Sequence, residues 1–290
     1  MKALIIAAGD GGRFRPLTND TPKALIPVLG LSLLERIILT SKKAGIKDFV
    51  VILGYKGEMI KDKFASGGKY GVKISYAENP AWRKENGLSV LAAENLLEQD
   101  ENFVLLMGDH LFDYRILKTL ISQKLGKDEC ILCIDRGLDN VVDFNDVTKV
   151  KVEDGYVKAI GKELGKQDQY QKDFNAFDTG IFLCSVCIFD ALKKVDKNYR
   201  LNLTEGIRIL AEQGKMRTLD VSGNFWLDLD TASDLSVAEK RLLKSLTKST
   251  DGLISRHINR KISTILSRLL VKTRIKPNTL SLINFFTAII

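Results

Sequence analysis

Glycines and cations gather directly after the first apolar run of the chain. The segment AAGDGGRFRPL, residues 7–17, follows KALII, contains Arg13 and Arg15, and is soon followed by Lys23. Backbone N–H groups that no side chain covers, together with cations, are what a triphosphate needs. The segment lacks the Gly-Lys-Ser/Thr of a Walker loop and the last glycine of a GxGxxG motif. By itself it therefore fits either a phosphate-binding loop or a tight turn after a strand.

Two later segments supply carboxylates. MGDH, residues 107–110, has Asp109 at the end of an apolar run, and a carboxylate at a strand end suits Mg²⁺. In FWLDLDTASDL, residues 225–235, Asp228 and Asp230 would share one face of a strand and could approach one ion. Helix capping is the alternative interpretation at both places. A glycine loop, cations and acids from distant segments are the equipment of phosphoryl or nucleotidyl transfer.

The first 110 residues alternate between strand-like apolar runs and helical patterns. Strands are expected over 2–8, 48–54, 72–79 and 102–110, and helices over 31–46, 56–66 and 87–99. Ser32 and Glu35 have capping-box spacing, and Gly45 suits the end of the first helix. This order predicts an α/β fold with a Rossmann-like, doubly wound sheet, mixed but mostly parallel, whose sites lie at the carboxyl ends of the strands.

The chain from residue 129 on is richer in strands. Strands are expected over 129–135, 148–154, 156–162, 177–189 and 216–222, and helices over 202–214 and 231–246. No internal repeat and no low-complexity linker divides this part from the first.

Four cysteines form two CxxC pairs, Cys130/Cys133 and Cys184/Cys187. Paired CxxC motifs can bind zinc, and a disulfide is a second alternative. The surrounding runs ECILCID and FLCSVCIF are apolar and strand-like, so neighbouring residues would alternate between the faces of a sheet. We therefore expect the cysteines to act as small buried hydrophobic residues.

The formal net charge of +8 is concentrated at the end of the chain. Residues 251–290 hold seven basic residues against one acidic residue and carry +6 of it. The rest is near neutral, so we expect no nucleic-acid partner for the main domain and an anionic surface facing the tail. The opening MKALIIAAGDGG has too short an apolar stretch for a signal peptide, which predicts an intracellular main domain.

The basic tail has the pattern of an amphipathic helix. Apolar residues recur at helical spacing over 253–270 with basic residues largely between them, which suits a membrane surface. Pro277 breaks the pattern, and the apolar residues 279–290 are shorter than the ~20 residues of a membrane span. They are expected to begin a first transmembrane helix. A dimerisation helix or an ordinary core helix is the alternative.

Several motifs together resemble one family. LIIAAGDGGRFRPLTNDTPKALIPV is similar to the opening AAGxG[TS]RxxPLT…PKxLxPV of nucleotidyltransferases of the sugar-nucleotide pyrophosphorylase type. KENGLSVL, MGDHLFD, DVTKVKV, AFDTGIFL and WLDLDTASDL resemble the cytidylyltransferase domain that joins CTP to inositol-1-phosphate. In that family the domain is often fused to a membrane-embedded CDP-alcohol phosphotransferase, as in synthases of the di-myo-inositol phosphate phosphate type. The tail resembles the entry of that second domain.

The resemblance implies an organisation and a partner set. It implies a nucleotidyltransferase domain over 1–245 and, over 246–290, a basic amphipathic juxtamembrane helix with the start of a transmembrane helix. The protein would then lie on the cytoplasmic side of the cell membrane, tethered by its carboxyl-terminal region. Its ligands would be CTP and a phosphorylated polyol, and homodimerisation would run through the missing membrane domain.

The resemblance also implies roles for individual residues. Lys23 would neutralise charge at the α-phosphate, and Arg13 would hold the CTP phosphates. The CTP phosphates, base and ribose would contact Ala8, Gly9, Gly11, Gly12, Asn86, Gly87 and Ser89. Mg²⁺ would be held by Asp109 and Asp228, with Asp230 as a helper. The acceptor would contact Lys149 and Lys162 through its phosphate, and Asp178 and Thr179 through its polyol.

Two residues depart from the family pattern. Gly12 stands where the family has Thr or Ser, and Asp10 adds a negative charge to the loop. These departures favour an alternative, a weak or non-catalytic domain that serves as a soluble cap or scaffold of a membrane enzyme. A third hypothesis keeps the fold with a different nucleotide or acceptor. Phosphotransferase activity is not expected, because the acidic motif GxxxDxxxD is absent.

Overall fold

The computed structural model describes residues 1–97, 102–126, 128–141, 143–165, 173–195 and 201–245, together with Leu270, Asn278 and Thr279. The predicted juxtamembrane helix over 246–290 therefore lies almost wholly outside the described residues. Among the residues that are described, no helix has the length and apolar character that crossing a membrane requires.

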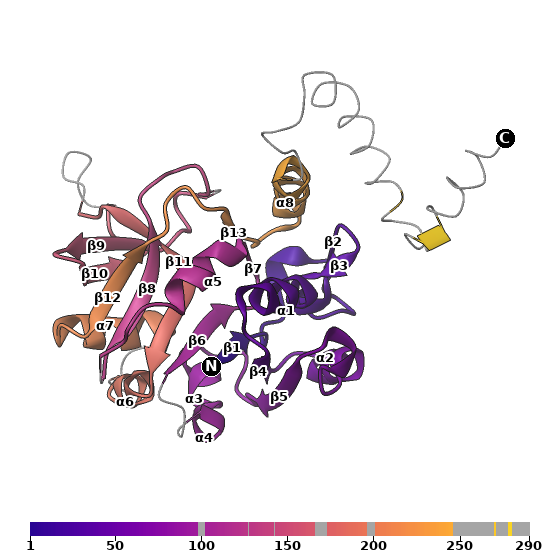
Figure 1. The fold of residues 1–290 in the computed structure, drawn as a ribbon, viewed down its shortest axis with the longest axis horizontal. Helices are drawn as coiled ribbons and strands as arrows, with labels where there is room; N and C mark the ends of the chain where they lie inside the picture. Colours follow the sequence, from indigo (N-terminus) through magenta and orange to yellow (C-terminus); the bar gives the residue numbers. More distant parts are fainter. Residues whose placement is uncertain are drawn as a thin grey trace.

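A nine-stranded sheet runs through the molecule in the order β5-β4-β1-β6-β11-β8-β12-β10-β9 (Figure 1). Its first part is parallel and consists of β1 (Lys2–Ile6), β4 (Asp48–Leu53), β5 (Lys73–Glu78) and β6 (Asn102–Met107). These strands confirm the four expected from the sequence, although the last one ends at Met107, before Asp109. The Ser32–Glu35 capping box is present at α1 (Leu33–Ala44), and Gly45 ends that helix with a φ of 108°.

The second part of the sheet is mixed. It comprises β8 (Cys130–Asp135), β9 (Lys149–Glu153), β10 (Tyr156–Gly161), β11 (Ala176–Ser185) and β12 (Met216–Asp220). β10 and β11 run against their neighbours, whereas β8 and β12 are parallel. β9 pairs with both β10 and β11, so this part of the sheet curls back on itself.

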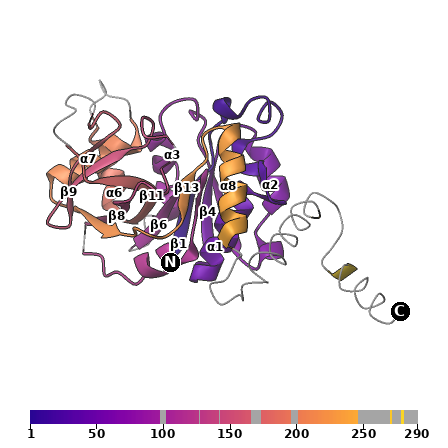
Figure 2. The same cartoon turned by 90° about the horizontal axis from the view of Figure 1, so that it is seen from above.

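Helices cover both faces of the sheet (Figure 2). One apolar cluster joins the face carrying Ala3 and Ile5 to α1, α2 (Gly57–Phe64) and α5 (Tyr114–Leu120). The other joins the face carrying Leu4 and Ile6 to α3 (Gly87–Leu91), α6 (Cys187–Lys193) and α7 (Leu203–Glu212). Alternate residues of one strand thus serve opposite layers, because side chains of a strand have a period of two.

A small two-stranded sheet beside the main one carries Asp228, and Asp109 directly precedes it. β7 (His110–Phe112) pairs antiparallel with β13 (Trp226–Asp228), and α8 (Ala232–Ser245) follows. A second short hairpin joins β2 (Pro27–Val28) to β3 (Leu31–Ser32). The helix predicted over 87–99 is broken into α3 and α4 (Glu94–Leu97).

The strand predicted over 177–189 is too long, because β11 ends at Ser185 and Cys187 begins α6. A short apolar run fits a buried strand and a buried helix equally well. All four cysteines are buried with free thiols, so the disulfide alternative is wrong. In the part of the chain that the structure describes, the one group spaced for a metal ion contains no cysteine.

Candidate active site

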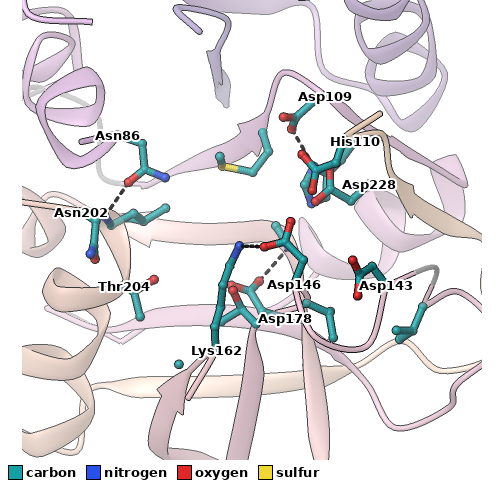
Figure 3. A pocket seen from close by; sticks show the side chains of 18 of the residues that line it. Asn86, Asp109, His110, Asp143, Asp146, Lys162, Asp178, Asn202, Thr204 and Asp228 are labelled. Atoms are coloured by element: carbon teal, nitrogen blue, oxygen red, sulfur yellow. Dashed lines mark hydrogen bonds and ion pairs between the residues drawn. The ribbon is translucent and has the colours of Figure 1, made fainter. Parts of the chain in front are cut away.

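A cleft of about 900 Å³ opens where the two parts of the sheet meet, at the carboxyl ends of β1 and β6 (Figure 3). Close backbone packing builds this end: Gly108 N donates to Ile6 O at 2.9 Å, and a Cβ on Gly108 would lie 2.3 Å from that oxygen. Seven residues predicted for the site line the cleft, namely Arg13, Asn86, Asp109, Lys162, Asp178, Asp228 and Asp230.

The glycine segment forms a short 3-10 turn, η1 (Gly12–Phe14), behind Gly11. Gly11 has a φ of +63°, and a Cβ there would lie 2.8 Å from Lys23 Cβ, so the loop packs directly on Lys23. The Asp10 carboxylate is engaged within the loop: it accepts from Gly12 N at 3.2 Å and pairs with Arg15 Nη2 at 3.2 Å. Asp10 thus already occupies one N–H that the phosphate-loop hypothesis needs.

Lys23 points into a cluster of acids. Its Nζ lies 2.7 Å from Asp109 Oδ2 and 3.5 Å from Asp230 Oδ1, and its side chain is only 13% exposed. Burial acts to lower the pKa of Lys23, but the carboxylates of Asp109 and Asp228 outweigh it and raise that pKa overall. Lys23 is therefore a fixed cation at any working pH.

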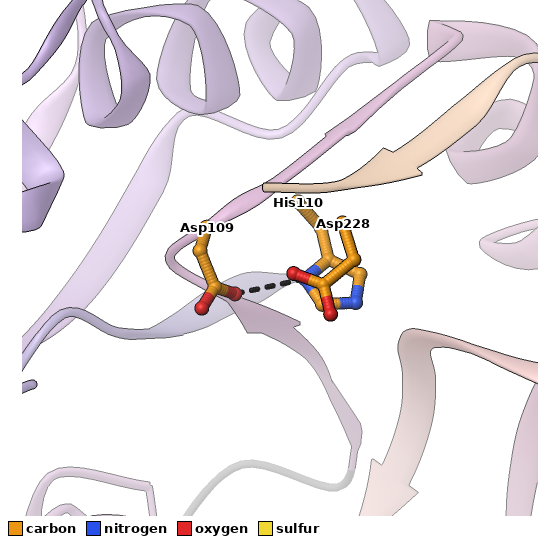
Figure 4. A group of neighbouring side chains, drawn as sticks. All are labelled: Asp109, His110 and Asp228. Atoms are coloured by element: carbon orange, nitrogen blue, oxygen red, sulfur yellow. Dashed lines mark hydrogen bonds and ion pairs between the residues drawn. The ribbon is translucent and has the colours of Figure 1, made fainter. Parts of the chain in front are cut away.

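Asp109, His110 and Asp228 form a compact group (Figure 4). The β7–β13 register sets Asp228 opposite His110, and the three candidate ligand atoms lie within 4.8 Å of one another. His110 Nδ1 is 2.8 Å from Asp109 Oδ1 and 3.6 Å from Asp228 Oδ1. Asp228 Oδ1 is buried and makes no hydrogen bond within the described residues.

Glycine and tryptophan position the His110 ring. A Cβ on Gly180 would lie 2.7 Å from His110 Nε2, so only glycine lets β11 pass the ring at this distance. On its other side the ring stacks on Trp226 with centroids 6.5 Å apart. His110 was not among the site residues predicted from the sequence, although it directly follows Asp109 in the motif MGDH and could have been found there.

Burial sets the charges in this group. It raises the pKa of Asp228 to about 7, and the negative charges of Asp109 and Asp230 act in the same direction. Burial lowers the pKa of His110, but Asp228 and Asp109 outweigh it and raise that pKa to about 9. Near neutral pH the group therefore holds a proton on His110. Its two carboxylates, with one oxygen unsatisfied, suit a hard cation that prefers oxygen ligands, such as Mg²⁺.

Arg13 and Lys162 meet on a residue that the sequence analysis missed. Asp146 pairs with Arg13 Nη1 through one carboxylate oxygen. Through the other it pairs with Lys162 Nζ (Figure 3). Arg13 Nη2 also lies 2.6 Å from Asp230 Oδ1. The motif DVTKVKV begins at Asp146, but nothing in it indicates a pairing with Arg13, which is 133 residues away in the sequence.

At the predicted acceptor end, only some of the expected residues face the cleft. Asp178 lines it and accepts from Gly180 N at 2.7 Å, and burial raises its pKa to about 6. Thr179 is fully buried and donates to Cys133 O at 2.8 Å. Lys149 is 2% exposed, with its ammonium 4.8 Å from the centroid of the Phe144 ring. Neither Lys149 nor Thr179 is among the residues that line the cleft, and their substrate contacts stay predictions.

The segment predicted for the base and ribose is hydrogen-bonded to the residues at the start of α7 and directly before it. Asn86 Oδ1 accepts from Leu203 N at 2.8 Å, and Gly87 N donates to Leu201 O at 3.1 Å. Asn86 lines the cleft. Ser89 is 3% exposed, and its hydroxyl accepts from Asn79 Nδ2 at 2.9 Å, so a direct ligand contact by Ser89 is not supported.

Ala8 is a buried backbone support of the loop. It is 3% exposed, and its carbonyl accepts from Tyr55 N at 3.0 Å. Gly9 has open space around the position of a Cβ, so its backbone is uncovered on that side. Gly12 likewise meets only the Asp10 carboxylate there, at 3.7 Å.

Comparison with known proteins adds three similarities. Residues 2–245 match the family model described as nucleotidyl transferase. A bifunctional IPC transferase and DIPP synthase of Aquifex aeolicus is 36% identical over 98% of this chain and 61% of its own length. The protein of the same name from Archaeoglobus fulgidus is 33% identical over 98% of this chain and 52% of its own length. The chain thus spans only part of these relatives.

A solved structure shares the fold. The inositol-1-phosphate CTP transferase from T. maritima superposes with a TM-score of 0.70 at 23% identity, over 87% of this chain and 98% of that one.

Proposed function

The chain belongs to the nucleotidyl transferase family, and on this basis we propose that it transfers the CMP part of CTP to inositol-1-phosphate or a similar phosphorylated polyol. The observation that carries the proposal is that Lys23, packed against the glycine loop, pairs with Asp109, which lines the cleft together with Asp228. The choice of CTP and an inositol phosphate draws on the printed names of the relatives and of the structural neighbour.

In the proposed reaction, an oxygen of the acceptor phosphate attacks the α-phosphorus of CTP in line with the bond to the β-phosphate. A new P–O bond to the acceptor forms as the α–β bridge breaks, and pyrophosphate leaves. The attacking phosphate is already ionised near neutral pH, so neither a general base nor a covalent intermediate is required. Catalysis of this kind consists of positioning the ligands and stabilising their negative charge.

The chain's own cations and acids divide this work. Lys23, buried and held by Asp109, would neutralise charge at the α-phosphate, while Arg13 on the loop would contact the outer phosphates. Asp109 and Asp228 would hold Mg²⁺, with Asp230 beside them. The ion would supply further charge neutralisation to the phosphates.

The acceptor would lie against the opposite wall. Lys162 offers an ammonium to its phosphate, and Asp178 offers a carboxyl group to the hydroxyls of a polyol. Asp178 is fixed by Gly180 N, which makes it a precise hydrogen-bonding partner for one hydroxyl.

A weakly active or scaffolding domain is the alternative, and one observation favours it. Asp10 takes up the Gly12 N–H within the loop, where the triphosphate would bind. The cluster of Lys23, Asp109 and Asp228 favours the enzyme, because a scaffold has no need to bury a lysine among carboxylates at a cost in desolvation.

Pyrophosphate release tests the proposal. The full chain is assayed with CTP, UTP, ATP, GTP and dTTP, each with inositol-1-phosphate, glycerol phosphate and glucose-1-phosphate, with and without Mg²⁺. The proposal expects release with CTP and inositol-1-phosphate in the presence of Mg²⁺. Release with another pair would correct the substrates, and no release with any pair would overturn the enzyme in favour of the scaffold.

We further propose that the basic tail holds the protein at the cytoplasmic face of the membrane. The support is the charge of residues 251–290, where each cation near an anionic surface contributes about 1 kcal/mol. Replacing Arg256, Arg260 and Lys261 by Gln should weaken binding to anionic vesicles on the order of a hundredfold. Pyrophosphate release should not change. Unaltered vesicle binding would contradict the tether.

A further inference from the structure

We propose that Asp146 is an internal counter-ion of Arg13 and Lys162, and that phosphate ligands bind by displacing it. The proposal rests on the proposed function for the identity of its physiological ligands. It makes Asp146 a specificity-determining residue, because it sets how strongly a phosphate must bind to enter the cleft.

The geometry is that of a carboxylate shared by two cations. Asp146 lies in the connection between β8 and β9 and lines the cleft. One of its oxygens pairs with Arg13, from the loop after β1, and the other pairs with Lys162, directly after β10. The side chain of Asp146 is 27% exposed, so solvent screens these pairs only in part. The residue therefore joins the two walls of the cleft.

The cations concerned are the ones a phosphate would seek. Arg13 and Lys162 are more than half exposed, at 57% and 52% of their side chains, and both line the cleft. A carboxylate and a phosphate present similar paired oxygens to an arginine. Asp146 thus occupies donor groups that a ligand phosphate would also use.

A continuous row of alternating charges extends from this residue. Arg13 also pairs with Asp230 at 2.6 Å, and Asp230 lies 3.5 Å from Lys23, which pairs with Asp109. By neutralising Arg13 and Lys162, Asp146 lowers the attraction of the cleft for single small anions. A nucleotide that also coordinates a metal and packs its base gains enough from its other contacts to displace the carboxylate.

Two roles of Asp146 predict opposite signs for one measurement. If Asp146 only positions Arg13 and Lys162, its removal disorders both cations and weakens anion binding. If it is a competing counter-ion, its removal frees them and strengthens anion binding. The test is therefore the affinity of the full chain for inorganic pyrophosphate without divalent metal, measured by calorimetry for wild type and Asp146→Asn.

We expect Asp146→Asn to bind pyrophosphate on the order of tenfold more tightly, since charge-assisted hydrogen bonds are the ones set free. Asp146→Glu, which keeps the charge, should remain near the wild type. The gain should vanish in the double variant Asp146→Asn/Arg13→Gln, because the freed guanidinium is then absent. The matched control is Asp143→Asn, since Asp143 also lines the cleft but accepts from Asn145 N rather than holding these cations.

A second test is the steady-state kinetics of pyrophosphate release by the wild type and by Asp146→Asn. Asp146→Asn should lower KM for CTP and increase inhibition by inorganic pyrophosphate, with a smaller change in kcat. Weaker or equal pyrophosphate binding by Asp146→Asn would overturn the counter-ion. The result for pyrophosphate binding does not depend on which nucleotide is the substrate. An enzyme that does not use CTP would therefore refute the proposed substrate, while calorimetry would still decide whether Asp146 is a counter-ion.

Discussion

The ammonium of Lys23 lies 2.7 Å from the carboxylate of Asp109, at the point where the glycine loop meets the end of β6. The lysine proposed for the α-phosphate and the acid proposed for Mg²⁺ are thus partners before any ligand binds. The pair keeps Lys23 charged despite its burial. Loss of one partner leaves the other buried and uncompensated, which is costly.

Lys23→Met should therefore remove catalysis while leaving the sheet intact. Removal of one well-placed electrostatic group at a site of this kind costs about 10²–10³ in kcat. Pyrophosphate release measures the loss, and far-ultraviolet circular dichroism checks the fold. Lys61→Met is the control, because Lys61 pairs with Glu58 and Glu78 on the surface, away from the cleft. A Lys23→Met variant with wild-type turnover would exclude Lys23 from the mechanism.

Gly11 links loop conformation to the position of Lys23. Gly11→Ala should place a Cβ 2.8 Å from Lys23 Cβ at a φ of +63°, which costs about 1–2 kcal/mol of backbone strain alone. We expect a large fall in kcat together with a lower melting temperature. Gly68→Ala provides the comparison, since a Cβ there meets nothing within 4 Å. Equal kcat values for the two variants would argue against the loop's role in holding Lys23.

Asp10 is expected to restrain the loop's activity. Asp10→Ser removes the negative charge and frees the Gly12 N–H, so KM for CTP should fall about tenfold or more, in line with a charge-assisted hydrogen bond of about 1.5–3 kcal/mol. Steady-state kinetics at fixed Mg²⁺ measure the change. Asp20→Ser serves as the control, because the Asp20 side chain is 99% exposed and lies away from the Gly12 N–H. A higher KM in Asp10→Ser would instead assign Asp10 a supporting role.

Local patterns and strand order were predictable from the sequence, whereas contacts across the cleft were not. The Ser32–Glu35 capping box depends on residues three apart and was confirmed. The grouping of Asp109 with Asp228 was expected only from the family resemblance. The pairing of β7 with β13, which no local pattern predicts, places Asp228 opposite His110 and so adds His110 to the group.

Aromatic side chains from other segments explain why Lys149, unlike Lys162, does not line the cleft. Charged residues alternate with valines along β9, which is typical of a strand with one exposed face. The ammonium of Lys149 nevertheless lies over the rings of Phe144 and Phe174. Whether an aromatic side chain from another segment covers a lysine depends on tertiary packing, which has no periodicity in the sequence. The pairing of Asp146 with Arg13 was hidden for the same reason.

The affinity for Mg²⁺ should depend on pH through Asp228. Its pKa is raised to about 7, so below that pH the folded protein holds a proton on the carboxyl group that the ion needs. Affinity should therefore rise as pH increases from 6 to 8, and binding near pH 7 should release protons. Calorimetric titration of Mg²⁺ in two buffers of different ionisation enthalpy counts those protons. Asp228→Asn, which does not titrate, should bind the ion weakly at every pH. An affinity that stays constant between pH 6 and 8 in the wild type would remove Asp228 from the metal site.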